Sequence, residues 1–207
     1  RKRYSTTKIK VGVGCMIIYA TKQTVDRYGI KMPENFQDPI MRQIVLDVYN
    51  CEKNDRLLEW GAKLFYFDRR KCIQICHFAS KLTVVLVDIK KADLESVGEL
   101  VARYLIDIYS DNKRMTNLLK RFFEEHPLVC FAKLTDRKII SAMNRFQSIY
   151  LEDGYRLYDF IEDGILKTIN LNRKINKEYL VSDKIDGKTK YYYPAKRFEE
   201  LLINYYK

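Results

Sequence analysis

Glycine, proline and histidine are scarce in this chain. Its 207 residues include eight glycines, four prolines and two histidines. Disordered segments are usually rich in glycine, proline and charge, so this scarcity argues against disorder away from the chain ends. Hydrophobic residues make up 47% of the sequence, enough for a core that needs neither disulfides nor metal. We therefore expect a folded protein without a metal site.

Long hydrophobic runs are also missing, and no segment approaches the roughly 20 apolar residues of a membrane-spanning helix. The run of residues 11–20 follows basic residues, as in a signal peptide, but it contains two glycines and lacks a cleavage site. The five cysteines are odd in number and form no Cys-x-x-Cys motif, which is typical of reduced thiols. These features predict a cytoplasmic protein without a membrane partner.

Nucleotide-binding motifs are absent. Gly12 and Gly14 precede a strand-like run and lack the third glycine of a dinucleotide fingerprint, and no Gly-x-x-x-x-Gly-Lys occurs. We therefore expect no cofactor. Because Met16 opens the first strand-like run, residues 1–15 are expected to be an N-terminal extension that need not be native.

The clearest fold signal lies between residues 57 and 109. Three apolar runs at residues 57–67, 72–78 and 82–87 are joined by very short polar segments and followed by an amphipathic helix. Short connections between strands are typical of an antiparallel meander. The third run is apolar on both faces, which predicts a central strand. A tight turn is expected around Arg69 and Arg70, with Asp68 ahead of it.

Other periodicities complete an α+β prediction with a mainly antiparallel sheet and helices packed chiefly on one face. Helical spacing predicts helices near residues 22–28, 40–49, 93–108, 115–125, 135–150 and 194–205. Residues 180–193 predict a hairpin around Asp186-Gly187. We expect a core domain at residues 16–150 and a hairpin–helix appendage at residues 151–207, packed on that core.

The net charge of +11 is uneven along the chain: residues 1–10 and 167–207 each contribute +5, whereas residues 11–109 contribute +1. Two expected hairpins carry exposed cations that could bind nucleic acid or another anion. They are Arg69, Arg70 and Lys71 on the first hairpin, and Lys184, Lys188 and Lys190 on the second. Solvated surface charge is the simpler interpretation of both groups.

His77 is the main candidate for catalysis. It ends the second strand of the meander, and the strand's alternation places it on the opposite face from Cys72 and Cys76, which excludes a Cys–His pair there. A structural histidine is the favoured interpretation. The alternative is an unfamiliar enzyme that uses His77 with Asp68 or Asn144.

Several motifs occur in order along the chain: Trp60-Gly61-Ala62-Lys63-Leu64, Asp68-Arg69-Arg70-Lys71-Cys72 and Lys90-Lys91-Ala92-Asp93-Leu94. On these motifs the chain resembles an uncharacterised bacterial domain family of unknown function that also occurs on mobile elements. The family pattern has Asn at the position of His77 and Ser at that of Lys138, which weakens a special role for either. The resemblance implies no activity or cofactor.

The sequence as a whole favours a binding protein for a macromolecular partner, either nucleic acid or protein. The runner-up is an enzyme with a site near His77. A third alternative is a structural or toxin–antitoxin-like partner protein, which would carry a large exposed apolar patch.

Overall fold

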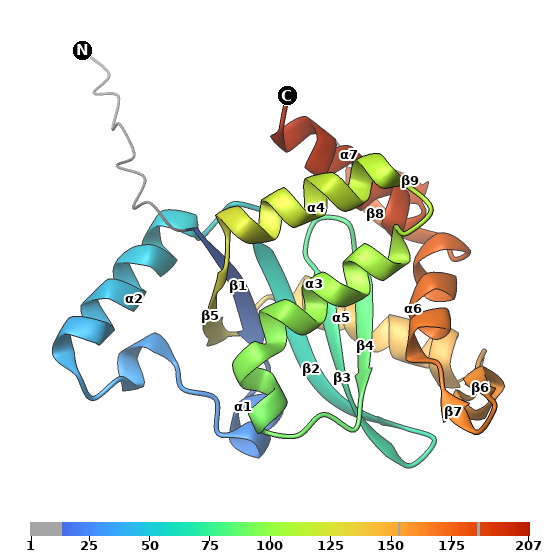
Figure 1. Cartoon of the computed structure of the whole chain (residues 1–207), viewed down its shortest axis with the longest axis horizontal. Coiled ribbons are helices and arrows are strands. Elements are labelled where there is room, and N and C mark those ends of the chain that lie inside the picture. The colour runs from blue at the N-terminus through green and yellow to red at the C-terminus, as the bar shows by residue number, and fades with distance from the viewer. Residues whose placement is uncertain (1–13, 153, 186) are drawn as a thin grey trace.

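The computed structural model describes residues 14–152, 154–185 and 187–207 (Figure 1). The basic residues 1–10, Gly12 and Asp186 lie outside the described residues. The main sheet has the strand order β4-β3-β2-β1-β5. Its strands are β1 (Cys15–Ala20), β2 (Glu59–Phe67), β3 (Arg70–His77), β4 (Thr83–Val87) and β5 (Leu128–Lys133).

The described residues also form seven α-helices and two small hairpins. The helices are α1 (Lys22–Tyr28), α2 (Pro39–Glu52), α3 (Val97–Ile108), α4 (Lys113–Glu125), α5 (Arg137–Phe146), α6 (Thr168–Lys177) and α7 (Pro194–Tyr205). The hairpins are β6–β7 (Ile161–Glu162 and Ile165–Leu166) and β8–β9 (Val181–Ile185 and Lys188–Tyr192).

The predicted meander is present. Strands β2, β3 and β4 pair antiparallel in sequence order, and Val84 and Val85 of β4 are both fully buried on opposite faces. The sheet as a whole, however, is mixed instead of mainly antiparallel. Strand β1 pairs parallel with both β2 and β5, because the chain between β1 and β2 runs through α1 and α2 and returns to the same edge before β2 begins.

Strand β4 lies at one end of the sheet, so its predicted central position is wrong. It is nevertheless enclosed, because helix α6 covers its free edge. Asn176 accepts a hydrogen bond from Thr83 N at 2.8 Å and donates to Thr83 O at 2.7 Å. Asn172 makes the same pair of bonds to Val85 N (2.7 Å) and O (3.0 Å). Two side-chain amides thus replace the missing neighbouring strand.

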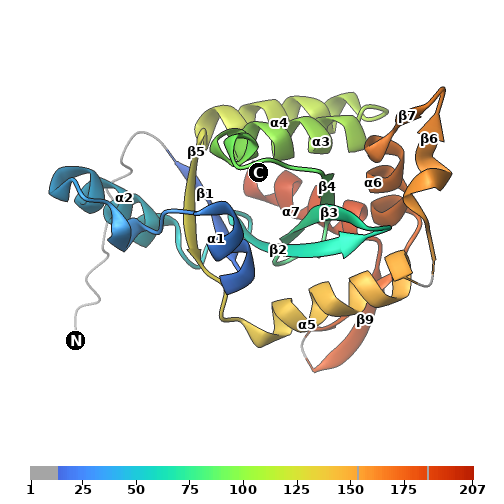
Figure 2. The ribbon, with the colours of Figure 1, turned by 90° about the horizontal axis from the view of Figure 1, so that it is seen from below.

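Helices cover both faces of the sheet, whereas the sequence predicted helices chiefly on one face (Figure 2). Helices α3, α4 and α7 pack on the face that presents Met16, Ile18 and Trp60, and together they form the largest core. Helix α2 contributes Val48 to a small core on the other face, where Met143 of α5 joins another.

Two local predictions also need correction. The β2–β3 turn consists of Asp68 and Arg69, both with positive φ (47° and 63°), and Arg70 already belongs to β3. The turn is therefore of the two-residue primed kind despite the absence of glycine. In α2, the helical spacing of residues 40–49 predicts that Ile40 and Ile44 face inward together with Val48. They are instead 71% and 49% exposed, because only the C-terminal half of this helix meets the sheet.

Candidate functional site

A cleft of about 1170 Å³ opens between helix α5, hairpin β8–β9 and the sheet face next to them. Six cationic residues line it, against three acidic ones. The cations are Arg56, Lys81, Arg137, Lys138, Arg145 and Lys184, and the acids are Glu59, Asp136 and Asp183. A concave site with a net positive lining attracts anions and strengthens their binding.

Helix α5 forms one wall of the cleft. Asp136 caps its N-terminus by accepting hydrogen bonds from Lys138 N (2.8 Å) and Ile139 N (3.3 Å). The apolar side of the helix seats Ile139 and Met143 against Gly61, where an added Cβ would lie 3.2 Å from either side chain. Residues four apart share one side of a helix, so the cations of α5 lie away from this apolar side, and Arg137, Lys138 and Arg145 line the cleft.

The cations of α5 are available to a ligand. Arg137 and Arg145 are exposed and eight residues apart, so they lie two turns apart along the same row of the helix. Neither they nor Lys138 forms an ion pair within the described part of the chain. No carboxylate among the described residues therefore forms an ion pair with these cations.

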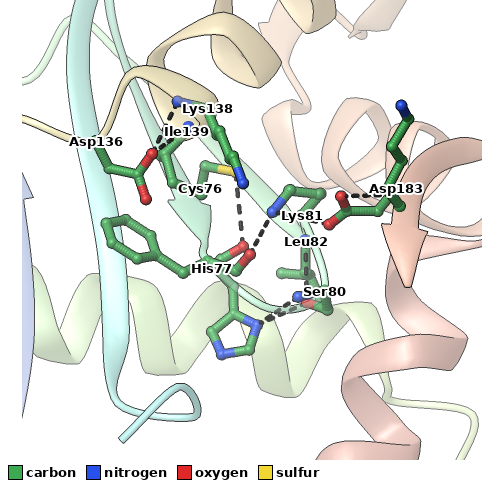
Figure 3. A network of polar contacts seen from close by, with 11 residues as sticks. Cys76, His77, Ser80, Lys81, Leu82, Asp136, Lys138, Ile139 and Asp183 are labelled. Atoms are coloured by element: carbon green, nitrogen blue, oxygen red, sulfur yellow. Dashed lines mark hydrogen bonds and ion pairs between the residues drawn. The ribbon is translucent and has the colours of Figure 1, made fainter. Parts of the chain in front are cut away.

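Hairpin β8–β9 forms the facing wall. Asp183 holds it to the β3–β4 connection through an ion pair with Lys81, whose Nζ lies 3.5 Å from the carboxylate (Figure 3). Lys184, Thr189 and Tyr191 of this hairpin line the cleft, and Tyr191 is 71% exposed. The wall therefore combines a cation with an aromatic ring that is free to stack on a ligand.

The acids of the cleft are all engaged within the protein. Glu59 accepts hydrogen bonds from the Tyr19 hydroxyl (2.9 Å) and from Asn54 N (3.2 Å). Asp136 is the cap of α5, and Asp183 pairs with Lys81. Contacts within the protein thus occupy these carboxylates, whereas the α5 cations form no ion pair among the described residues.

A chain of polar side chains crosses the sheet beneath α5. Lys63 of β2 donates to Asn144 and, at 2.7 Å, to Gln147 Oε1. Gln147 Nε2 in turn donates to Gln74 Oε1 of β3 at 3.0 Å. Gln74 is fully buried and belongs to the lining of the cleft.

The structure separates the two cationic hairpins expected from the sequence. Lys184 lines the cleft, and Lys188 and Lys190 lie exposed on the paired strand β9. The β2–β3 turn with Arg69 lies at the opposite end of the view in Figure 1. The six residues therefore do not form one surface.

The cations beside the β2–β3 turn are also partly occupied. Arg70 forms an ion pair with Asp88, and Lys71 Nζ lies 5.4 Å from the ring centroid of Tyr28. Asp68 accepts a hydrogen bond from Leu157 N and lies 3.5 Å from the Arg156 guanidinium. This acidic neighbour weakens the positive field at the turn.

His77 lies in the core and not in the cleft. Its ring points to the opposite side of the sheet from Cys76 (Figure 3), and the ring packs between Trp60 and Phe198, with centroids 4.8 and 5.0 Å away. Nδ1 lies 2.7 Å from the Ser80 hydroxyl, and Nε2 lies 3.2 Å from Leu57 O. Burial lowers the pKa of His77 to about 3. Both ring nitrogens are thus committed to the fold.

The remaining candidates do not converge with the cleft cations. Cys15, Cys72, Cys76 and Cys130 are buried, and burial raises the pKa of the Cys72 thiol to about 12. In the described residues, no group of three or more His, Cys, Asp or Glu side chains is placed to hold a metal ion. A smaller hollow beside α7 contains Lys177, but Asp111 pairs with it at 2.8 Å.

Sequence reasoning missed the α5 cations and Gln74. Arg137, Ser141 and Arg145 repeat every four residues, and this spacing could have revealed a polar row along one side of the predicted helix. The fact that this row faces a second wall depends on the position of hairpin β8–β9. Nothing in the sequence around Gln74 marks it as a residue of a site, because a single polar residue in an apolar strand has many explanations.

No helix in the described ranges combines the length and the apolar composition needed to cross a bilayer. A search of the curated proteins found no match. Residues 17–197 match a family that is described as a domain of unknown function, DUF6933. This match spans most of the chain, including most of β1, the meander, α5 and hairpin β8–β9, and it agrees with the resemblance to an uncharacterised domain family. The chain therefore belongs to the DUF6933 family.

Proposed function

We propose that this protein binds single-stranded nucleic acid along the cleft between α5 and hairpin β8–β9. The observation that carries this proposal is that Arg137 and Arg145, both without an ion pair among the described residues, face a wall that carries Lys184 and the exposed ring of Tyr191. Cations that track a phosphate backbone, combined with an aromatic platform for bases, are typical of sites for single strands.

Two other interpretations have less support. A double helix is read largely by elements inserted into its grooves, whereas here the cations line a hollow between two walls. An enzyme built around His77 would need that ring to reach a substrate, yet His77 does not line the cleft and both its ring nitrogens form hydrogen bonds in the core. A binding role is consistent with the cationic cleft and requires no reactive side chain.

The proposal is tested by fluorescence anisotropy with a labelled strand of about 12 nucleotides, a length within the usual range of such sites. We expect the variant Arg137→Ala/Arg145→Ala to bind more weakly. We also expect its slope of log affinity against log salt to fall by about 1.4, the value for two lost contacts to single-strand phosphates.

The matched control is Arg69→Ala/Arg70→Ala, which removes the same charge from the β2–β3 hairpin. We expect this variant to keep an affinity close to that of the wild type. The proposal is wrong if the wild-type protein does not bind the strand, or if both double variants lose affinity and salt dependence equally.

A further inference from the structure

One buried hydrogen-bond donor at the cleft has no acceptor. Gln74 is fully buried and lines the cleft, and its Nε2 makes no hydrogen bond within the described residues. An unpaired polar group in this position destabilises the fold, and native proteins leave few of them. Such a group at a cationic cleft points to a ligand that supplies the acceptor.

The direction of the neighbouring hydrogen bonds determines which polar atom of the Gln74 amide has no hydrogen-bond partner. The Lys63 ammonium can only donate, so it must meet the carbonyl oxygen of Gln147. Gln147 therefore turns its NH₂ group toward Gln74, whose Oε1 accepts at 3.0 Å. Reversing the Gln74 amide would set two NH₂ groups against each other, so Nε2 remains the group without a partner.

The surroundings of Gln74 determine which acceptor fits. The cleft lining also contains uncharged side chains, among them Tyr19 and Phe78, which stack with ring centroids 5.2 Å apart. The carboxylates of Glu59 and Asp183 also border the cleft. Three of the cleft cations without an ion pair among the described residues lie on α5, so a phosphate is favoured there, and the uncharged amide of Gln74 is left to a neutral group. A flat, uncharged ring with an acceptor at its edge matches the remaining chemistry.

We propose that Gln74 Nε2 donates a hydrogen bond to the edge of a nucleobase that enters the cleft, while the phosphates of the same strand lie along α5. This inference rests on the proposed function. Every base carries an acceptor on its edge. Gln74 therefore adds affinity for a base without selecting one base over another.

The test compares a strand of about 12 nucleotides with an abasic strand of the same length, which carries the phosphates and sugars alone. We expect wild-type protein to bind the base-bearing strand roughly tenfold more tightly, since contacts to one well-seated base contribute about 1–3 kcal/mol. Gln74→Met keeps the side-chain length and removes the donor. We expect it to shrink the difference to less than about threefold, and to leave abasic binding and its salt slope unchanged.

Each outcome decides between the two proposals. Equal binding of both strands by wild-type protein overturns the base contact, and the stacking on Tyr191 with it, but leaves binding of the phosphate backbone along α5 standing. Loss of abasic binding in Gln74→Met also overturns the base contact, because Gln74 would then act on the backbone or through the fold. Binding of neither strand overturns the proposed function itself. An undiminished difference in Gln74→Met overturns the contact to Gln74 as well, because stacking on Tyr191 would then account for the preference. The variant Tyr191→Ala, at an exposed position, leaves Gln74 in place and should still prefer the base-bearing strand. Equal binding of both strands by Tyr191→Ala would assign the preference to Tyr191 and overturn the contact to Gln74.

Discussion

At the scale of single residues, His77 shows how a reactive side chain can serve the fold alone. Trp60, Phe198 and Leu57 surround its ring, which is held by hydrogen bonds to Ser80 and to the Leu57 carbonyl. A charged imidazolium would lose its hydration here without gaining a carboxylate partner, and burial is the main cause of the lowered pKa. The folded protein therefore holds His77 in its neutral form.

This environment predicts that acid destabilises the protein through His77. The pKa of His77 is about 3 in the folded state and near 6.5 when unfolded. The unfolded chain thus binds the extra proton first as pH falls. The stabilisation is fully present above about pH 6.5 and is lost toward pH 3. We expect wild-type protein to lose about 2 kcal/mol through this residue between pH 7 and pH 5, as measured by urea unfolding.

The comparison protein is His77→Asn, which cannot titrate in this range. Its absolute stability is lower because the ring contacts are gone, so the measurement is the change of unfolding free energy with pH in each protein. An equal change in both proteins would contradict the buried neutral histidine.

At the scale of elements, helix α6 covers the free edge of β4, so no further strand of the described residues joins the sheet there. Asn172 and Asn176 lie one turn apart, and the outward-facing backbone groups of Thr83 and Val85 have the same spacing along β4. Each amide offers one donor and one acceptor to β4, as a residue of a neighbouring strand would. Two asparagines therefore supply hydrogen-bond partners for the free backbone groups at the edge of β4. The sequence shows these residues only as part of a polar cluster, because their partners lie about 90 positions earlier.

We expect Asn176→Leu to lower the unfolding free energy by about 2 kcal/mol, since it leaves the N–H and C=O of Thr83 buried without partners. Asn172→Leu should behave similarly at Val85. The double variant should also aggregate more readily, because an unpaired strand edge can pair with another molecule. Chemical unfolding and light scattering measure the two effects.

Asn170→Leu is the matched control on the same helix. Asn170 donates to Glu162 at 2.7 Å on the exposed side, away from β4. We expect a change below about 0.5 kcal/mol, as for most surface substitutions. A comparable loss in all three single variants would mean that the edge contacts have no special value.

At the scale of the whole molecule, the C-terminal helix belongs to the main core. Phe198 and Leu202 of α7 are fully buried in the cluster that includes Trp60 of β2. The Tyr109 hydroxyl also donates to Ala195 O at 2.5 Å, which ties α3 to the start of α7. We infer that residues 151–207, set apart in the sequence as an appendage, unfold together with residues 16–150.

Phe198→Ala is expected to lower the unfolding free energy by about 3–5 kcal/mol, the usual cost of deleting a buried phenylalanine. The fluorescence of Trp60, the single tryptophan, reports on β2, and far-UV circular dichroism reports on all helices. Because both groups share one core, the two probes should give the same unfolding midpoint.

Tyr205→Ala provides the comparison, since Tyr205 lies in the same helix and is 38% exposed. Its loss should be clearly smaller than that of Phe198→Ala. Separate midpoints for the two probes in wild-type protein would show that the C-terminal part unfolds on its own.

Several elements could be predicted from the sequence because their signals are local. Thr21 caps α1, and Gly29 ends it with a φ of 60°. Helix α4 ends at His126, before Pro127, because proline disfavours the helical conformation in the preceding residue. Gly187, with a φ of 76°, lies in the predicted hairpin turn. In each case a few adjacent residues restrict the backbone angles.

The sheet order and the cleft depend on contacts between distant parts of the chain, and only the tertiary structure decided them. Parallel pairing of β1 with β2 follows from where α1 and α2 return the chain. Likewise, α5 faces hairpin β8–β9 because both pack on the same side of the sheet. Local periodicity reports which side of an element is apolar, but the packing of the whole chain determines what that side meets.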